Sequence, residues 1–280
     1  MPVVIKESIH PDVNLKSEYK MLALVGKHPN IIDFFGCVHS TDFTRLAIMM
    51  EFCPFGSLEN LLHCNTHLNY STKHALIWIM NICSALIHLH SIDIVHRDLK
   101  PANVLLFKSG KMAKISDFGT TKRLALRMTS TTGSIPWMAP EVYKGQNYDE
   151  KCDIYSVGVI FWECLTRKVP YSWLNCNLIA IISSVAENGL RPPKIKNNSP
   201  ALNTIIKSCL DNNPEYRKNS NLLRDTVKIE YEKLNTFLWP IVNMPLSDQS
   251  DLKFLNLLSQ NVDGLDGWTV KLRSLLVFVF

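Results

Sequence analysis

Several common signals are missing from these 280 residues, and each absence narrows the class of protein. The eight cysteines form no C-x-x-C pair, which argues against a zinc ribbon or a disulfide scaffold, and we expect reduced thiols. No apolar run approaches the roughly 20 residues that span a bilayer. The N-terminus lacks the charged and apolar regions of a signal peptide, so a cytoplasmic protein is expected.

An excess of one charge sign is also missing. The chain has 30 Lys and Arg against 25 Asp and Glu, a net charge of +5 without long single-sign blocks. Such a mild balance selects neither nucleic acid nor a membrane surface as a partner. The hydrophobic fraction of 46% is enough for a sizeable core, which suits one large domain or two lobes of one unit.

The chain is organised around residues 96–103, which read H-R-D-L-K-P-A-N, with D-F-G at 117–119 and A-P-E at 139–141. Phosphoryl transfer needs a carboxylate that orients the attacking hydroxyl and accepts its proton, which suits Asp98. It needs oxygen ligands for Mg²⁺, which suits Asn103 and Asp117. Lys100 has the reach to meet the transferring phosphate as a point charge. The pattern therefore predicts a catalytic site for phosphoryl transfer.

The order and spacing of these motifs resemble the catalytic core of the eukaryotic protein kinases. The presence of a lysine at position 100 resembles the pattern of the Ser/Thr kinases within that family. The stretches at 128–129, 133–134, 137–142 and 147–153 resemble the tyrosine-kinase-like group, and within it the transforming-growth-factor-β-activated kinases, which are MAP kinase kinase kinases. The resemblance covers about residues 1–235.

This resemblance implies an α+β, bilobal protein-kinase fold with a truncated N-terminal β-lobe. We expect a partial N-lobe at residues 1–52, a mainly α-helical C-lobe at 53–236, and a C-terminal tail of unknown structure at 237–280. It further implies a serine/threonine kinase whose protein substrate is a MAP kinase kinase, with activator or adaptor proteins as possible partners.

The resemblance also implies an ATP site with Mg²⁺ as the second cofactor. Lys6, which ends a β-prone run, would contact the α- and β-phosphates, and Glu18 on the next helix would be its ion-pair partner. A surface glutamate is the alternative for Glu18, but the G-K-H-P-N-I-I run at 26–32 favours the pair. The other implied nucleotide-site residues are Val4 and Leu105 at the adenine, Met50 as gatekeeper, and Glu51 and Cys53 in the hinge.

The polar segment at 117–141 predicts a phosphorylation switch, with an ordinary Ser/Thr-rich loop as the alternative. By the family's pattern, Thr129 and Ser134 are the best candidates for modification. A phosphate adds close to two negative charges, and Arg97 beside the catalytic aspartate would collect it.

Hydrophobic periodicity predicts the remaining elements. The helix expected at 151–167 is apolar nearly all round, so it belongs in the middle of a domain. The resemblance implies that Asp153 at its start caps the backbone of the catalytic loop, and that Glu141 pairs with Arg217. Further helices are expected at 13–24, 71–90, 177–187, 201–210 and 221–236, strands at 31–38 and 46–52, and a hairpin from 104–106 and 113–115.

One part of the family's pattern is absent, because the sequence contains no G-x-G-x-x-G. In kinases that loop holds the β- and γ-phosphates with backbone N–H groups. Three explanations stay open: a truncated gene model of an active kinase, a short isoform that binds ATP poorly, or a catalytically impaired kinase-fold scaffold that acts through protein partners.

Overall fold

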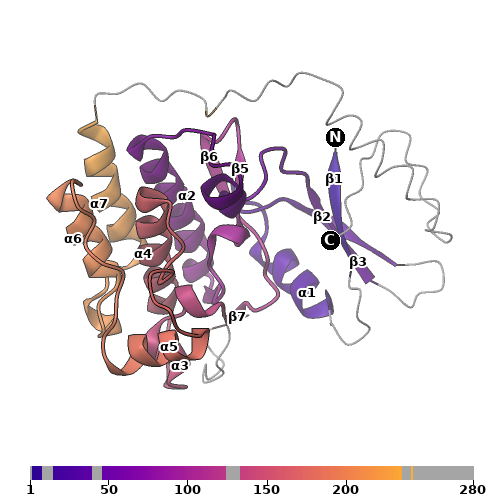
Figure 1. Ribbon diagram of the computed structural model, residues 1–280. Coiled ribbons are helices and arrows are strands. Elements are labelled where there is room, and N and C mark those ends of the chain that lie inside the picture. Colours follow the sequence, from indigo (N-terminus) through magenta and orange to yellow (C-terminus); the bar gives the residue numbers. More distant parts are fainter. Residues whose placement is uncertain (1, 8–14, 40–45, 124–132, 235–240, 242–280) are drawn as a thin grey trace.

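Apolar residues recur at strand-like spacing near the start of the chain and at helical spacing later, and the fold follows that change. The computed structural model describes residues 2–7, 15–39, 46–123, 133–234 and 241. A small antiparallel sheet with one helix stands beside a larger, mainly helical part (Figure 1). These are the two lobes of the expected α+β fold. The exact boundaries expected at residues 52 and 236 stay predictions.

The small lobe holds strands β1 (Val3–Glu7), β2 (Phe34–His39) and β3 (Leu46–Glu51) in the order β1-β3-β2. The prediction started the second strand at residue 31, three residues too early. Ile31 and Ile32 are buried against the larger lobe instead, where the Ile32 amide donates to the Ile115 carbonyl at 3.0 Å. That contact fixes the small lobe on the large one.

Helix α1 (Leu15–Val25) packs on this sheet. Its buried face carries Leu15, Glu18, Leu22 and Val25, at the three- and four-residue steps of one helical stripe. A carboxylate in an apolar stripe needs a partner, because burying an unpaired charge is costly. The fold therefore places Glu18 where a cation must meet it.

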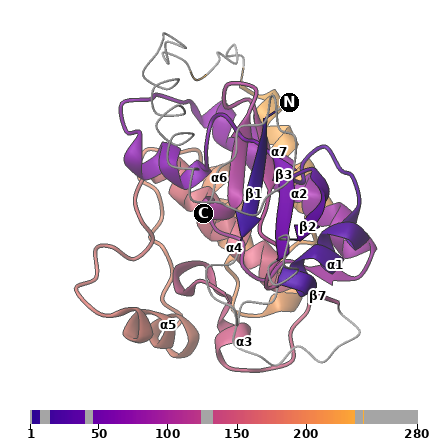
Figure 2. The same ribbon diagram turned by 90° about the vertical axis from the view of Figure 1, so that its right-hand side faces the viewer.

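The large lobe is built mainly from helices. Four of the five helices predicted there lie within one residue of the expected bounds and the fifth ends four residues early, whereas no bounds were predicted for the short helices at 60–64 and 140–143. In both views α3 and α5 lie together at one end of the molecule (Figures 1 and 2). The helices are η1 (Asn60–Cys64, a π-helix), α2 (Thr72–Ser91), α3 (Pro140–Tyr143), α4 (Lys151–Thr166), α5 (Leu178–Glu187), α6 (Pro200–Cys209) and α7 (Ser220–Glu232), with single 3₁₀ turns η2 (Pro101–Asn103), η3 (Ile135–Trp137) and η4 (Pro214–Tyr216).

Helix α2 lies against α4, α7 and the strand β6. It is long and apolar enough to cross a membrane by length and composition, which the sequence analysis did not anticipate. However, 56% of its apolar window is buried inside the protein, and core helices of soluble proteins have the same composition. Its apolar residues form the middle of the lobe, as those of α4 do.

Two short strand pairs carry the catalytic motifs. β5 (Val104–Phe107) and β6 (Met112–Ile115) form the predicted hairpin, and β4 (Ile94–Val95) pairs with β7 (Lys122–Arg123), which was not predicted. The loop at 96–103 follows β4, and D-F-G follows β6. Pairing therefore brings two segments about 20 residues apart in sequence to one place.

Candidate active site

The ammonium group of Lys6 joins both lobes. Its Nζ lies 2.9 Å from each carboxylate oxygen of Glu18 and 3.1 Å from Oδ1 of Asp117. The Glu18 side chain is only 4% exposed, whereas 30% of Lys6 and 41% of Asp117 face solvent. The buried glutamate thus holds the lysine at the mouth of a site that Asp117 shares, and the predicted ion pair is present.

Burial and the neighbouring opposite charges shift the pKa values of Lys6, Asp117 and Glu18 in opposite directions. Burial lowers the pKa of Lys6, but the carboxylates of Glu18 and Asp117 outweigh it, so its pKa is raised. Burial raises the pKa of Asp117, but Lys6 outweighs it and the pKa is lowered. Burial dominates at Glu18, whose pKa stays above its usual value although Lys6 opposes the shift. Asp117 is consequently ionised at neutral pH.

Three polar residues surround Asp98, namely Lys100 and Asn103 of the catalytic loop and Ser134 of the later segment. Oδ2 of Asp98 lies 3.1 Å from Nζ of Lys100, and the Asn103 amide donates to the Asp98 carbonyl at 2.8 Å and to Oδ2 at 3.3 Å. On the other side, the Ser134 amide donates to Oδ1 at 2.8 Å, and Lys100 donates to the Ser134 hydroxyl at 2.8 Å. The half-buried carboxylate of Asp98 is therefore held in one orientation by both its oxygens.

Asp153 at the start of α4 binds the backbone of the catalytic loop at residues 96–97. Its fully buried carboxylate accepts the backbone N–H groups of His96 at 3.0 Å and Arg97 at 2.9 Å, and a side-chain contact from His90 at 3.0 Å. Burial raises the pKa of Asp153, but the hydrogen bond and charge of His90 outweigh it, so the pKa is lowered. Arg97 has φ +74°, a costly conformation for a side chain of its size, and these bonds hold it there.

The residues expected to hold Mg²⁺ come close together, and their donor set suits that ion. Both the Ser116 amide and the Ser116 hydroxyl donate to the Asn103 carbonyl, so Asp117 follows directly beside Asn103. The Asn103 nitrogen is committed to Asp98, which leaves the amide oxygen as an acceptor. No group of three His, Cys, Asp or Glu suited to a metal occurs in the described ranges, but Mg²⁺ needs only one or two protein oxygens beside phosphates.

The expected adenine-site residues lie on the two facing edges of the lobes. Val4 and Met50 are cross-strand partners in the small lobe, and Leu105 lies on β5 of the large lobe in a bridge with Ser57. All three hydrophobic side chains are half-buried. In the part of the chain that the structure describes, the Cys53 amide makes no hydrogen bond, so this hinge donor is free to meet a ligand.

The thiol of Cys53, unlike its backbone amide, is already hydrogen-bonded within the protein. It donates to the Leu106 carbonyl at 2.7 Å, and burial raises its pKa to about 11. It therefore fastens the hinge to the strand β5 and is a poor nucleophile.

Of the two predicted phosphorylation sites, the structure describes only Ser134. Thr129 lies outside the described residues. Ser134 lies within the catalytic loop's hydrogen bonds, a contact that sequence reasoning missed because it joins segments 36 residues apart. Arg97 is 7% exposed and lies 5.9 Å from the ring centre of Tyr148. Phosphorylation of Thr129 or Ser134 stays a prediction.

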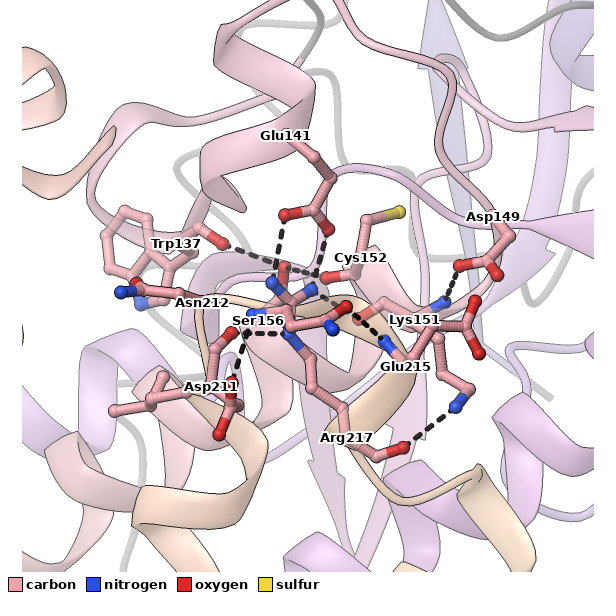
Figure 3. A network of polar contacts seen from close by, with 12 residues as sticks. Trp137, Glu141, Asp149, Lys151, Cys152, Ser156, Asp211, Asn212, Glu215 and Arg217 are labelled. Carbon is pink, nitrogen blue, oxygen red and sulfur yellow. Dashed lines mark hydrogen bonds and ion pairs between the residues drawn. The ribbon is translucent and has the colours of Figure 1, made fainter. Parts of the chain in front are cut away.

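The Glu141–Arg217 pair links A-P-E to η4, as expected. Its two hydrogen bonds measure 2.6 and 2.9 Å, and Figure 3 shows both guanidinium ends of Arg217 turned toward the Glu141 carboxylate. The same guanidinium donates to the carbonyls of Asp211 and Lys151. Four of the five N–H donors of this buried arginine are thereby used.

Another buried carboxylate, that of Glu163, was not predicted. Glu163 on α4 accepts the Trp137 indole N–H at 2.9 Å and lies 2.6 Å from Nε2 of His63, although it is only 1% exposed. Ser156 donates its hydroxyl to the Trp137 carbonyl at 2.8 Å (Figure 3). Trp137 lies two residues before the A-P-E motif, so these bonds fix the segment beside the catalytic loop. A lone Glu in an apolar helix was the available signal.

Comparison with known proteins agrees with this geometry. Residues 3–228 match the protein kinase domain family. Mitogen-activated protein kinase kinase kinase 7 from Homo sapiens is 38% identical over 216 residues, which is 76% of this chain and 34% of the relative. Mitogen-activated protein kinase kinase kinase mom-4 from Caenorhabditis elegans is 35% identical over 233 residues, 83% of this chain and 42% of the relative.

The putative mitogen-activated protein kinase kinase kinase 7-like protein from Drosophila melanogaster is 34% identical over 211 residues, 73% of this chain. The chain spans 34%, 42% and 53% of these three relatives, so it matches one part of each. That part carries the kinase motifs. The chain therefore belongs to the protein kinase domain family and is similar to the mitogen-activated protein kinase kinase kinase 7 proteins.

Proposed function

We propose that this chain is a serine/threonine protein kinase that transfers the γ-phosphate of ATP to Ser or Thr of a protein substrate. The arrangement around Asp98 carries the proposal. Its carboxylate is oriented by Asn103 and Ser134 and lies 3.1 Å from the Lys100 ammonium. A hydroxyl docked there would meet a base for its proton and a cation for the transferring phosphate.

Mg²⁺ bound with ATP would neutralise part of the negative charge on the phosphates. Asp117 and the Asn103 oxygen would hold it, and Lys6 would bind the α- and β-phosphates while Glu18 keeps the ammonium in place. The adenine would lie between Val4 and Leu105, past Met50, with the backbone of Glu51 and Cys53 as its hydrogen-bonding partners. Arg97 would collect a phosphate on Thr129 or Ser134.

The relatives' names support a place in a MAP kinase cascade. We propose that this kinase acts as a MAP kinase kinase kinase in the cytoplasm, that its substrate is a MAP kinase kinase, and that activator or adaptor proteins control it. Neither nucleic acid nor a membrane is needed for this activity.

The proposal is tested with Asp98→Asn in a phosphoryl-transfer assay on a MAP kinase kinase. Turnover should fall roughly 10²–10⁴-fold, the usual contribution of a positioned acid–base group. Asp93→Asn, at an exposed carboxylate just before the same loop, is the matched control and should keep its rate. Equal rates for the parent and Asp98→Asn would exclude Asp98 as the base.

A scaffold role is the second candidate, because the 280 residues contain no G-x-G-x-x-G to hold the phosphates. It predicts retained partner binding without stabilisation by Mg²⁺-ATP. A melting temperature that rises with Mg²⁺-ATP concentration would count against it.

A further inference from the structure

Ile241 is held against the turn of the β5–β6 hairpin. Its amide donates to the Ser109 carbonyl at 3.0 Å, and its side chain is 1% exposed. A Cβ on Gly110 would lie 2.4 Å from the Ile241 Cδ1 atom, and the Trp78 indole fixes the Gly110 carbonyl at 2.7 Å. The hairpin turn is thus shaped to receive this one apolar side chain.

A cavity of about 450 Å³ lies beside that turn. One side is formed by the hairpin, through Phe107, Lys108 and Met112, and the other by Lys27 and the residues next to it after α1. Glu51 of the hinge strand also lines it. The cavity therefore spans the junction of the two lobes on the hinge.

The lysines that line this cavity differ in whether they have a charged partner among the described residues. Lys114 is buried and pairs with Glu51, and lies 3.6 Å from Asp33. By contrast, Lys27 and Lys108 are exposed and make no side-chain hydrogen bond or ion pair with any residue the structure describes. Two ammonium groups without a partner among the described residues thus flank the apolar side chains of Phe107 and Met112, an arrangement that suits an acidic peptide segment.

Such a segment follows Ile241 in the same chain. Residues 247–251 read S-D-Q-S-D, and no Lys or Arg occurs between Ile241 and Asp251. Asp248 follows Ile241 by seven positions, which an extended chain spans in roughly 23–25 Å. Because Ser109, which binds the Ile241 amide, is next to Lys108, Ile241 itself lies near the rim of the cavity.

We propose that residues 247–251 bind in cis to this cavity, with Asp248 and Asp251 on Lys27 and Lys108, and with Ile241 as the anchor. Anchoring raises the effective concentration of the acidic segment, so weak ion pairs suffice to hold it. This inference does not depend on catalysis and stands or falls separately from the proposed function.

The test is zero-length carbodiimide cross-linking of the full chain, which joins only contacting lysines and carboxylates. A mixture of ¹⁵N-labelled and unlabelled protein distinguishes contacts within one chain from contacts between copies. We expect peptides that join Lys27 or Lys108 to Asp248 or Asp251, both from the same isotope. Lys111, in the same turn but outside the cavity lining, is the internal control and should stay unlinked.

The anchor is tested with Ile241→Asp, which should abolish these cross-links while leaving every reacting group in place. Ile229→Asp, at an exposed isoleucine of α7, is the matched control and should keep them. If Ile241→Asp does not fold, the parent at 1 M salt replaces it, because screening to about 3 Å should remove the cross-links. Mixed-isotope products, no products, or products that persist without the anchor and at high salt would overturn the proposal.

Discussion

The backbone amide of Ser134 donates a 2.8 Å hydrogen bond to the carboxylate of Asp98, and the Ser134 hydroxyl accepts one from Lys100. The segment before A-P-E therefore touches the proposed base directly. Any change at Ser134 acts on the two groups that would handle the substrate hydroxyl and the phosphate.

Ser134→Asp should slow phosphoryl transfer, because a second carboxylate beside Asp98 competes for Lys100. We expect a fall of roughly 10²-fold in kcat, near the lower end for a disturbed acid–base group. Ser134→Thr keeps the hydroxyl and is the control. The measurement also bears on regulation: a faster Ser134→Asp variant would contradict this role and favour activation by phosphorylation at that position.

Lys6→Met should reduce kcat/KM roughly 10²–10³-fold, the usual cost of one preorganised group that meets developing charge. The variant loses the cation that Glu18 and Asp117 share, so the shift of melting temperature by Mg²⁺-ATP should shrink as well. Lys20→Met, at an exposed lysine of α1, controls for charge alone. Unchanged nucleotide binding in Lys6→Met would show that ATP does not use this lysine.

Arg217→Met should destabilise the fold by about 3–5 kcal/mol, because it leaves the Glu141 carboxylate buried without its cation. Denaturant unfolding measures this loss. Arg224→Met removes an arginine from an exposed pair with Asp225 and should cost only about 0–1 kcal/mol. Similar losses from both variants would mean that the buried pair has no special weight.

Asp153→Asn should lower both stability and activity, since an amide has only one oxygen for the N–H groups of His96 and Arg97. We expect a loss of about 1–3 kcal/mol at pH 7. The pKa of Asp153 is lowered in the folded state, so its charged form stabilises the fold above the unfolded pKa of about 3.9. That contribution is lost as pH falls through the lower folded pKa.

The difference in unfolding free energy between the parent and Asp153→Asn should therefore be full near pH 7 and shrink below about pH 4. Urea unfolding across this range checks it. A difference that grows on acidification would mean that the folded pKa of Asp153 is raised.

Motifs with fixed chemistry were the easiest features to predict. Lys6 and Glu18, 12 residues apart, form the expected ion pair, and Asp153 caps the catalytic loop, as the resemblance to the protein kinases implied. Long periodic helices such as α2 and α4 were also placed within a residue or two.

Contacts that depend on three-dimensional proximity alone were missed. The Ser134–Asp98 bond and the Glu163–His63 contact, across 100 residues, have no sequence pattern that announces them. The pairing of β4 with β7 escaped notice because each strand has two residues, too few to show alternation. Ile241 was assigned to a tail of unknown structure, because one apolar residue carries no periodic signal.

The packing of α2 against α7 has a consequence for how this protein is made. Helix α2 leaves the ribosome about 130 residues before α7, which at 5–20 residues per second means a delay of about 6–26 s. Throughout that interval the face of α2 that packs on α7 has no native partner, although β6 and α4 are already synthesised before α7. A nascent chain of this kinase is accordingly a substrate for chaperones that bind apolar segments, until its last helix is synthesised.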